Sequence, residues 1–422
     1  MLASLFPAAR NSEYARVDPP PPSELLARIR ALPSAGPLMR RLPEHPGVYL
    51  VGGAVRDLLL GGAPFDLDLV VDGDAGEVAA LLDGEVVIHD RFGTATVRVC
   101  GITYDLARAR RETYSRPGAL PEVAPASLEE DLRRRDFTVN AIAIALAGPD
   151  AGELNLVPGA LEDLDARLLR VLHKRSFLDD PTRMLSLARY RSRLGFELES
   201  GTRELLHDAV RERALSTVSG PRIGAELRLL AREPDPVQAM RSLRELRLDR
   251  AIHPAFGLDD PELARKALAL LPEDGRADRL VLALAGQHLP ADDLGRVLDE
   301  LAFDAADRDA IVAAATRADA VAAALSEARR PSEIASVASG ASPELVAIAG
   351  ALGPEGPARA WLSGLRDVRL EIDGRDLLER GISRGPAVGR GLRAALAAKL
   401  DGKARGRDDE LAIALEAARD PG

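Results

Sequence analysis

Cysteine, lysine and aromatic residues are scarce in this chain, and long apolar runs are absent from it. The single cysteine, Cys100, can close no internal disulfide and is too few for a thiolate metal site. Apolar stretches such as Ala141–Ala147 fall far short of the roughly 18 residues that a membrane helix needs. The first ten residues show no basic segment followed by a long apolar region. We therefore expect no secretory signal, no membrane contact and a cytoplasmic location.

The composition is that of a globular chain with an acidic balance. Of 422 residues, 46% are apolar and 29% are charged, which excludes whole-chain disorder, a collagen-like repeat and a membrane bundle. The length exceeds what one compact core usually organises, so we expect several domains. A net charge of −10 argues against binding nucleic acid through bulk positive charge. Any phosphate binding must therefore be local.

Strand-like and helix-like patterns occupy different parts of the chain. Strand signals concentrate between about residues 47 and 110, with helices expected at Val55–Leu60 and Ala75–Leu82. From about residue 160, nearly every segment has helical spacing broken by Pro and Gly, and we expect no strand there. The predicted fold class is α+β, a small mixed sheet followed by helical domains. We expect five parts: an N-terminal extension and helix (1–46), an α/β head (47–150), and a helical neck (151–235), body (236–362) and tail (363–422).

Two carboxylates follow a glycine pair in the head. The motif Gly52–Asp57 (GGAVRD) is followed by Asp66-Leu67-Asp68 on an apolar strand pattern. Residues i and i+2 of a strand point to one face, so Asp66 and Asp68 are expected to converge. Converging carboxylates suit Mg²⁺, which shares substrate phosphates for its remaining ligands. A lone Asp-x-Asp is usually a solvated strand end, but the preceding glycines, which admit a phosphate, and Arg56, which would bind it, favour a functional site.

A run of three arginines, Arg133-Arg134-Arg135, forms the second motif. It precedes a helix-like run that begins with Asp136. The start of a helix favours anions through its dipole, so the run predicts a site for a triphosphate. The alternative is an exposed basic helix start with Asp136 as its cap.

A third motif, Ser176–Arg183 (SFLDDPTR), carries an acid and a base three residues apart. Asp180 and Arg183 would lie on one helix face beside Pro181. Cytosine and adenine each present a ring-nitrogen acceptor beside an amino donor, and uracil and guanine reverse this order. One arginine donor beside one aspartate acceptor would therefore read C and A without a template. The alternative is that Asp180 caps the helix and pairs with Arg183.

The three motifs, in this order and spacing, resemble the class II tRNA nucleotidyltransferases, which comprise the CCA-adding enzymes and their bacterial poly(A) polymerase relatives. The resemblance covers most of the chain and implies a head like that of polymerase β. It implies catalytic, metal-binding roles for Asp66 and Asp68, with Mg²⁺ as cofactor, and nucleotide selection in the neck. Asp105 is placed where a third carboxylate would assist, although an ordinary edge or turn aspartate is the alternative. The nucleotide-binding positions implied are Gly53, Arg56, Arg135, Asp180, Arg183 and Arg189.

Some segments depart from the family pattern, and others indicate which subgroup of the family the chain resembles. Ser186 stands where the family usually has another nucleotide-contacting arginine, whose hydrogen bond would be worth about 1.5–3 kcal/mol. Val157–Ala160 replaces a more typical Asp-Pro-aromatic-Gly-Gly and is one residue shorter. Glu112–Glu130 lies where the family has a flexible loop that helps the switch from C to A; an ordinary connector is the alternative. The stretch Asp66–Asp74 looks closest to a subgroup that includes members adding only CC or only A.

The tail contains the clearest basic patch outside the head. Residues 384–407 include seven basic residues and one acid, Asp401, which gives a local charge of +6. Such a patch would neutralise tRNA phosphates, and a solvated helix face is the alternative. The tail patch consists of Arg384, Arg390, Arg393, Lys399, Lys403, Arg405 and Arg407.

The resemblance predicts an enzyme that adds C, A or both to the 3′ end of tRNA without a template. CTP and ATP would be the nucleotide substrates, the tRNA acceptor end the partner, and pyrophosphate the leaving group. Three alternatives stay open: a CC-only or A-only enzyme, a poly(A) polymerase with a different acceptor, and a catalytically impaired RNA-binding paralogue. The oligomeric state is not predicted.

Overall fold

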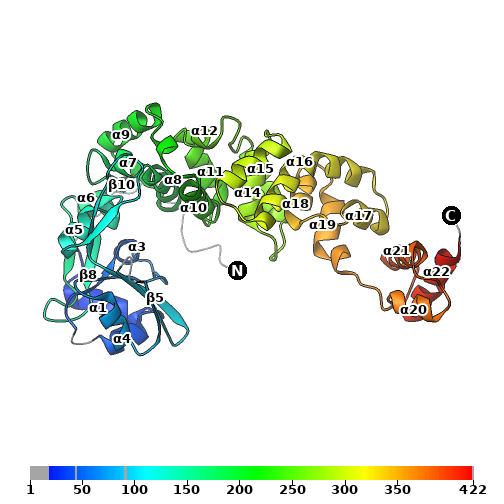
Figure 1. Cartoon of the computed structure of the whole chain (residues 1–422), viewed down its shortest axis with the longest axis horizontal. Helices are drawn as coiled ribbons and strands as arrows, with labels where there is room; N and C mark the ends of the chain where they lie inside the picture. The colour runs from blue at the N-terminus through cyan, green and yellow to red at the C-terminus, as the bar shows by residue number, and fades with distance from the viewer. Residues whose placement is uncertain (1–18, 43–44, 90–92, 421–422) are drawn as a thin grey trace. The chain divides into compact units, whose positions relative to one another are not determined.

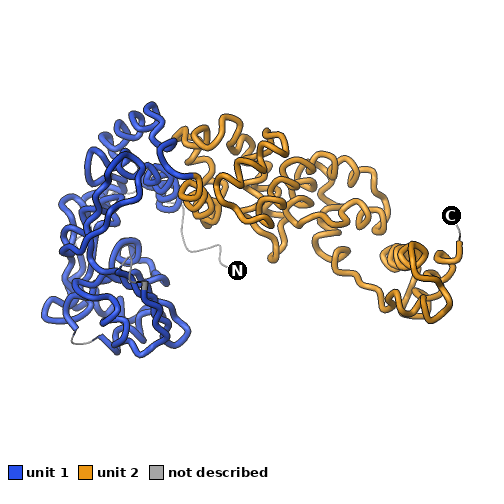
Figure 2. Tube along the Cα trace, in the orientation of Figure 1, with its two compact units in different colours: residues 1–219 blue, residues 220–422 orange. Residues whose placement is uncertain are grey.

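The computed structural model describes residues 19–42, 45–89 and 93–420, and it divides into two compact units. Unit 1 comprises residues 1–219 and unit 2 comprises residues 220–422 (Figure 2). Mixed α/β structure is confined to unit 1, and the described part of unit 2 contains helices without strands. This confirms the predicted α+β class. The finer division into five parts stays a prediction.

A seven-stranded mixed sheet organises the head. Its strand order is β3-β4-β5-β2-β1-β8-β9, and the neighbours are antiparallel except for β2 and β5, which run parallel. All four residues of β8 are buried, and so is every residue of β2 after its first. The central strands therefore carry the core of the head. The strands are β1 (Val48–Val51), β2 (Asp68–Val71), β3 (Glu85–His89), β4 (Thr94–Val99), β5 (Ile102–Arg108), β8 (Ile142–Ala145) and β9 (Leu154–Leu156).

Helices flank this sheet (Figure 1). Helix α3 contacts β1 and β8, and α4 contacts the strands from β2 to β5. Asp74 caps α4, because its carboxylate accepts hydrogen bonds from the N–H groups of Gly76 and Glu77. The expected helices in this region are confirmed with small shifts of their ends. The head helices are α1 (Pro22–Ala31), α2 (Gly36–Arg41), α3 (Gly53–Leu59), α4 (Ala75–Leu81), α5 (Leu128–Arg133) and α6 (Ala160–Asp165).

Three local expectations were wrong. The run after Arg135 is a 3₁₀ turn, Thr138–Asn140, followed by strand β8, because this β-branched segment is buried within the sheet. The arginines therefore lie at the end of α5 rather than at a helix start. The segment read as a loop or connector contains a hairpin of β6 (Arg110–Thr113) and β7 (Glu122–Pro125). After residue 160, the short strands β10 (Leu168–Leu169) and β11 (Glu197–Leu198) pair in parallel.

The remainder of the chain is helical. Unit 1 continues with α7 (Ser176–Asp179), α8 (Thr182–Leu194), α9 (Ser200–Arg211) and a 3₁₀ turn, Ala214–Thr217. Five helices of unit 2 have proline as their first residue, where no helical hydrogen bond is lost. Among the described residues, no helix is long and apolar enough to cross a membrane. The helices of unit 2 are α10 (Gly220–Ala231), α11 (Pro236–Glu245), α12 (Asp249–Ile252), α13 (Pro261–Leu270), α14 (Ala277–Gly286), α15 (Ala291–Glu300), α16 (Ala305–Glu327), α17 (Pro331–Val337), α18 (Pro343–Ala351), α19 (Glu355–Ser363), α20 (Gly374–Glu379), α21 (Pro386–Leu400) and α22 (Arg407–Arg419).

Candidate active site

Three carboxylates gather where β2 begins. Asp68 is the first residue of β2, and Asp66 precedes it by two residues. Asp105 on β5 is the register partner of Asp68, because the two strands run parallel. The side chain of Asp68 reaches the surface, yet the surrounding protein excludes enough water to raise its pKa. Arg135 opposes this rise, and the charges of Asp105 and Asp66 add to it. The structure thus brings the three acids together and leaves their negative charge incompletely balanced.

A pocket of about 370 Å³ is lined in part by Asp68, Asp105, Arg134 and Arg135. Thr96 donates a 2.8 Å hydrogen bond from its hydroxyl to Asp105 Oδ1 and so holds this carboxylate against β4. Acidic and basic groups therefore border the same opening, which is the arrangement that a metal–triphosphate complex requires.

The donor set fits a divalent cation. Burial raises the pKa of Asp68, and the charges of Asp105 and Asp66 raise it further, so a cation bound there would stabilise the charged carboxylate. Carboxylate oxygens are the ligands that Mg²⁺ prefers. Within the described ranges, no three His, Cys, Asp or Glu side chains are grouped closely enough to hold a metal ion by themselves. Asp66 and Asp68 could serve as two ligands for an ion whose other ligands are phosphate and water oxygens.

The glycine pair places the backbone close to Arg135. Gly52 has φ +69°, and a Cβ built on it would lie 2.9 Å from Arg135 Nη1. Glycine is therefore needed here both for the backbone conformation and for the approach of the guanidinium. Gly53 follows as the first residue of α3, beside the carboxyl end of β1.

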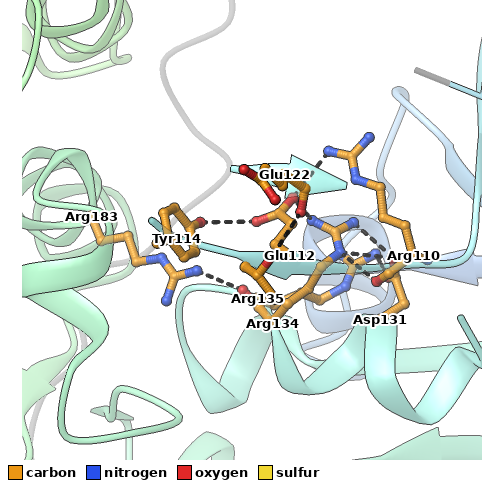
Figure 3. A network of polar contacts seen from close by, with 9 residues as sticks. Arg110, Glu112, Tyr114, Glu122, Asp131, Arg134, Arg135 and Arg183 are labelled. Carbon is orange, nitrogen blue, oxygen red and sulfur yellow. Dashed lines mark hydrogen bonds and ion pairs between the residues drawn. The ribbon is translucent and has the colours of Figure 1, made fainter. Parts of the chain in front are cut away.

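A buried carboxylate that the sequence reading overlooked holds the arginines in place. Asp131, on α5, is 0% exposed. Its Oδ2 accepts a 3.1 Å hydrogen bond from Arg135, and its Oδ1 accepts from Arg134 Nη2 at 2.7 Å and from the Arg110 N–H at 3.2 Å (Figure 3). Arg134 also donates to Glu112 on β6 at 2.7 Å. The hairpin and the pocket arginines thus share one anchor.

Arg56 is buried within the head. It is 1% exposed, and its guanidinium donates to Asn140 Oδ1 at 2.6 Å and to Asp57 Oδ1 at 2.8 Å. Its guanidinium carbon lies 5.4 Å from the centre of the Tyr190 ring, which Arg189 approaches to 4.6 Å. In this structure Arg56 therefore ties α3 to Asn140 and α8. The phosphate contact predicted for Arg56 and the nucleotide binding predicted for Arg189 stay predictions.

The two residues predicted to read the base are engaged within the protein. Arg183 donates from Nη1 to Ser176 Oγ at 2.7 Å and from Nη2 to the Arg134 carbonyl at 2.6 Å. Asp180 Oδ1 accepts from the N–H and the hydroxyl of Thr182 at 3.1 and 2.6 Å. Base reading by these side chains stays a prediction. Its geometric support is that Arg183 binds the residue that immediately precedes Arg135.

Tyr114, at the end of the hairpin, joins the same region. Its hydroxyl donates to Glu112 at 2.9 Å, and the ring lies beside Arg183 in Figure 3. Burial raises the pKa of Tyr114, and the charge of Glu112 raises it further. The phenol therefore stays protonated as a donor. Ser186, which replaces the arginine expected from the family pattern, is buried on α8 at 8% exposure.

The tail patch divides into paired and unpaired cations. Lys399 donates to the fully buried Glu410 at 2.7 Å, Arg407 pairs with Asp376, and Arg390 donates to the Asp420 carbonyl at 3.1 Å. The other four are exposed, and none forms an ion pair within the described residues. These four, the open tail cations, are Arg384, Arg393, Lys403 and Arg405.

The sequence pattern could have indicated Asp131, but not the pairing of Arg56. Asp131 lies three residues after the buried Leu128 and next to the buried Leu132, on the apolar stripe of α5. A carboxylate on such a stripe predicts a buried partner. The contact between Arg56 and Asn140 spans 84 residues, and no local signal announces it.

Comparison with known proteins identifies relatives over most of the chain. Residues 48–170 match the family model of the poly(A) polymerase head domain. A CC-adding tRNA nucleotidyltransferase from Deinococcus radiodurans is 37% identical, over 88% of this chain and 90% of the relative. An A-adding tRNA nucleotidyltransferase from Geobacter sulfurreducens is 35% identical over 94% of this chain. The chain spans only 47% of that relative, so about half of its length is matched.

Solved structures agree with these relatives. The Thermotoga maritima CCA-adding enzyme complexed with tRNA-CCA matches with a TM-score of 0.73 and 31% identity, over 93% of this chain and 98% of that chain. Structures of a CCA-adding enzyme with CTP and with ATP match as well. The fold resemblance therefore extends through both compact units.

Proposed function

Because the chain belongs to the class II tRNA nucleotidyltransferase family, we propose that it adds C, A or both to the 3′ end of tRNA, using CTP and ATP and releasing pyrophosphate. The observation that carries the proposal is that Asp68 and Asp105 line one pocket with Arg135, and that Asp66 is close enough for its charge to act on Asp68. Relatives that add CC, A or CCA all resemble this chain, and they support the reaction class without distinguishing its products.

The carboxylates and Arg135 divide the work of phosphoryl transfer. Divalent ions such as Mg²⁺, held by Asp66 and Asp68, would lower the pKa of the attacking 3′-hydroxyl and neutralise charge on the departing pyrophosphate. Arg135 would bind triphosphate oxygens from the opposite wall of the pocket. Asp131 fixes the direction of Arg135, so the cation is in place before the nucleotide enters. No side chain is required to act as a general base.

Selection of the nucleotide is assigned to Asp180 and Arg183. Arg183 is tied to the carbonyl of Arg134, so a base read there would belong to a triphosphate bound by Arg135. To bind a base edge, Arg183 would have to give up its hydrogen bonds to Ser176 and Arg134. Base recognition would then be coupled to movement of α8. Tyr114, which follows strand β6 of the hairpin, interacts electrostatically with Arg183. This contact supports a role for the hairpin in the change from C addition to A addition.

The test offers the purified chain three tRNA acceptors, ending before CCA, after the first C and after both C residues, with CTP or ATP supplied separately. With CTP alone a CCA-adding enzyme extends the first two acceptors, and with ATP alone it extends the third. A CC-adding enzyme stops after the second C, and an A-adding enzyme extends only the third acceptor. Absence of pyrophosphate release with every acceptor and nucleotide would refute the proposed activity and favour the RNA-binding paralogue.

A generic RNA of equal length is the matched control for the acceptor. A poly(A) polymerase would extend this RNA with a run of AMP, whereas the proposed enzyme extends tRNA by three nucleotides at most. Product length on a sequencing gel separates the two reactions, because the chemistry at the carboxylates is the same in both.

A further inference from the structure

Phe65 is the one exposed aromatic ring among the described residues. Its relative exposure is 67%, and every other described Phe, Tyr or Trp is buried or partly buried. In a chain where aromatics make up only 3% of the sequence, this placement is unusual. Single apolar side chains are common on protein surfaces, so the exposure of Phe65 becomes informative through its place immediately before Asp66.

Phe65 directly precedes Asp66 in the short connection between α3 and β2. The segment from Leu60 to Phe65 leaves the end of α3, where the Gly62 N–H donates to the Asp57 carbonyl at 2.8 Å and the Gly61 N–H donates to the Leu58 carbonyl at 3.1 Å. A Cβ on Gly62 would lie 3.0 Å from the Asp57 carbonyl oxygen, so glycine permits this close turn. On the other side, Leu67 is buried at 4% exposure. Phe65 is therefore presented from a short segment that is fixed at both ends.

We infer that Phe65 is a stacking platform for the terminal base of the RNA acceptor. The inference rests on the proposed function, which requires the acceptor's 3′-oxygen to reach Asp66 and Asp68. The base of that same nucleotide must then lie within one nucleotide of the carboxylates, and Phe65 immediately precedes Asp66 in the chain. An aromatic face binds any base, because every base has a π-face.

Sequence tolerance is the property that the acceptor position needs. The terminal base changes each time a nucleotide is added, so hydrogen-bond readout of one base would stall the reaction at the next step. The incoming base has the opposite requirement, since C and A must be distinguished from U and G, and stacking does not provide that distinction. Phe65 therefore suits the acceptor base and not the incoming nucleotide.

The test compares Phe65→Ala, Phe65→Leu and Phe65→Tyr with the wild type in steady-state CMP incorporation. Loss of one base–aromatic stack is expected to raise the KM for tRNA about tenfold in the Ala and Leu variants, with the KM for CTP within twofold of wild type. The Tyr variant keeps the ring and is expected to match the wild type. Leu81→Ala, at an exposed leucine on α4, is the control for removal of a surface apolar side chain.

An acceptor with an abasic terminal nucleotide identifies the stacking partner. This acceptor is expected to raise the KM about tenfold for the wild type and to have no further effect on Phe65→Ala, because both changes remove the same contact. A Leu variant equal to the wild type, or independent effects of the abasic site and Phe65→Ala, would overturn the inference. Thermal unfolding of each variant verifies folding, which an exposed side chain should not affect.

Failure of this inference differs visibly from failure of the proposed function. A wild-type protein that extends tRNA while all Phe65 variants keep wild-type KM values refutes the stacking role alone. A wild-type protein that extends no tRNA refutes the proposed function, and with it the acceptor that Phe65 would bind.

Discussion

Two carboxylates, one in each unit, show how the surroundings of an acid separate a reactive group from a structural one. Asp278 in unit 2 is 7% exposed; burial raises its pKa, but hydrogen bonds from Arg276 at 2.7 Å and Arg232 at 2.9 Å outweigh burial and bring the pKa to about 2. Asp68 in unit 1 has a raised pKa, because Arg135 does not compensate for burial and for the neighbouring Asp105 and Asp66. Arginines compensate for the burial of Asp278, whereas the surroundings of Asp68 leave its pKa raised, as expected of a carboxylate that we propose binds a cation.

The same distinction separates the arginines of the head from the cations of the tail. In the head, Asp131 holds Arg134 and Arg135 at the border of an open pocket. In the tail, Lys399 and Arg407 are engaged by Glu410 and Asp376 and join α21, α22 and α20. Charges counted along a sequence are therefore not equal to charges available to a ligand.

The largest effect is expected at Asp68. Asp68→Asn should lower nucleotide incorporation by at least about 10³-fold, because it removes a charged oxygen from the metal-binding pair. Its thermal midpoint should not fall, since a carboxylate with a raised pKa costs folding energy while charged and the amide carries no charge. Pyrophosphate release and thermal unfolding measure the two quantities. Full activity with reduced stability would make Asp68 a structural acid like Asp278.

The next effect concerns the anchor of Arg135. Asp131→Asn keeps the shape but weakens the charged hydrogen bonds to Arg134 and Arg135, each worth about 1.5–3 kcal/mol. We expect kcat/KM for CTP to fall about 10- to 100-fold when activity is measured at a temperature well below that at which the variant unfolds. Glu129→Gln is the matched control, because Glu129 on the same helix makes an exposed pair with Arg133 that contributes little. Equal values for the two variants would show that Asp131 does not position Arg135.

In unit 2 the expected change is in stability alone. Asp278→Asn should destabilise the chain by about 1–2 kcal/mol, a value reduced for the exposure of Arg276 and Arg232, and leave kcat unchanged. The folded pKa of about 2 lies below the ordinary aspartate value of 3.8, so this stability is complete above about pH 4 and is lost as the pH falls toward 2. Unfolding midpoints between pH 2 and 5 measure it. A variant with the wild-type pH dependence would contradict the assignment.

The smallest effect distinguishes the open tail cations from the paired cations of the tail patch. Replacing Arg393 and Lys403 by Ala should weaken tRNA binding about three- to tenfold and make the salt dependence of log K shallower by about 0.7–0.9 for each lost phosphate contact. Lys399→Ala should leave that slope unchanged and lower the thermal midpoint, because Glu410 would lose its partner. Filter binding between 50 and 200 mM salt measures the slope. A shallower slope for Lys399→Ala alone would assign the RNA contact to the paired cations.

Local patterns predicted the parts of the site that depend on neighbours in sequence. The helices α3 and α4 follow from spacing within a few residues, and so does the strand β2, although it was expected to include Asp66 and begins at Asp68. The helix expected after Arg135 was wrong, because burial of the 142–145 strand within a seven-stranded sheet overrode the local reading. Arg56 illustrates the remaining limit, since its partners Asn140 and Tyr190 come from distant segments.

The most direct measurement locates the metal. Crystals of the chain soaked with Mn²⁺ and a non-hydrolysable CTP analogue should give anomalous scattering peaks within bonding distance of Asp66 and Asp68, and Asp68→Asn crystals treated in the same way should lose them. Peaks located elsewhere, or an unoccupied pocket in the wild type with the nucleotide bound, would contradict the assignment of these two carboxylates as the metal ligands.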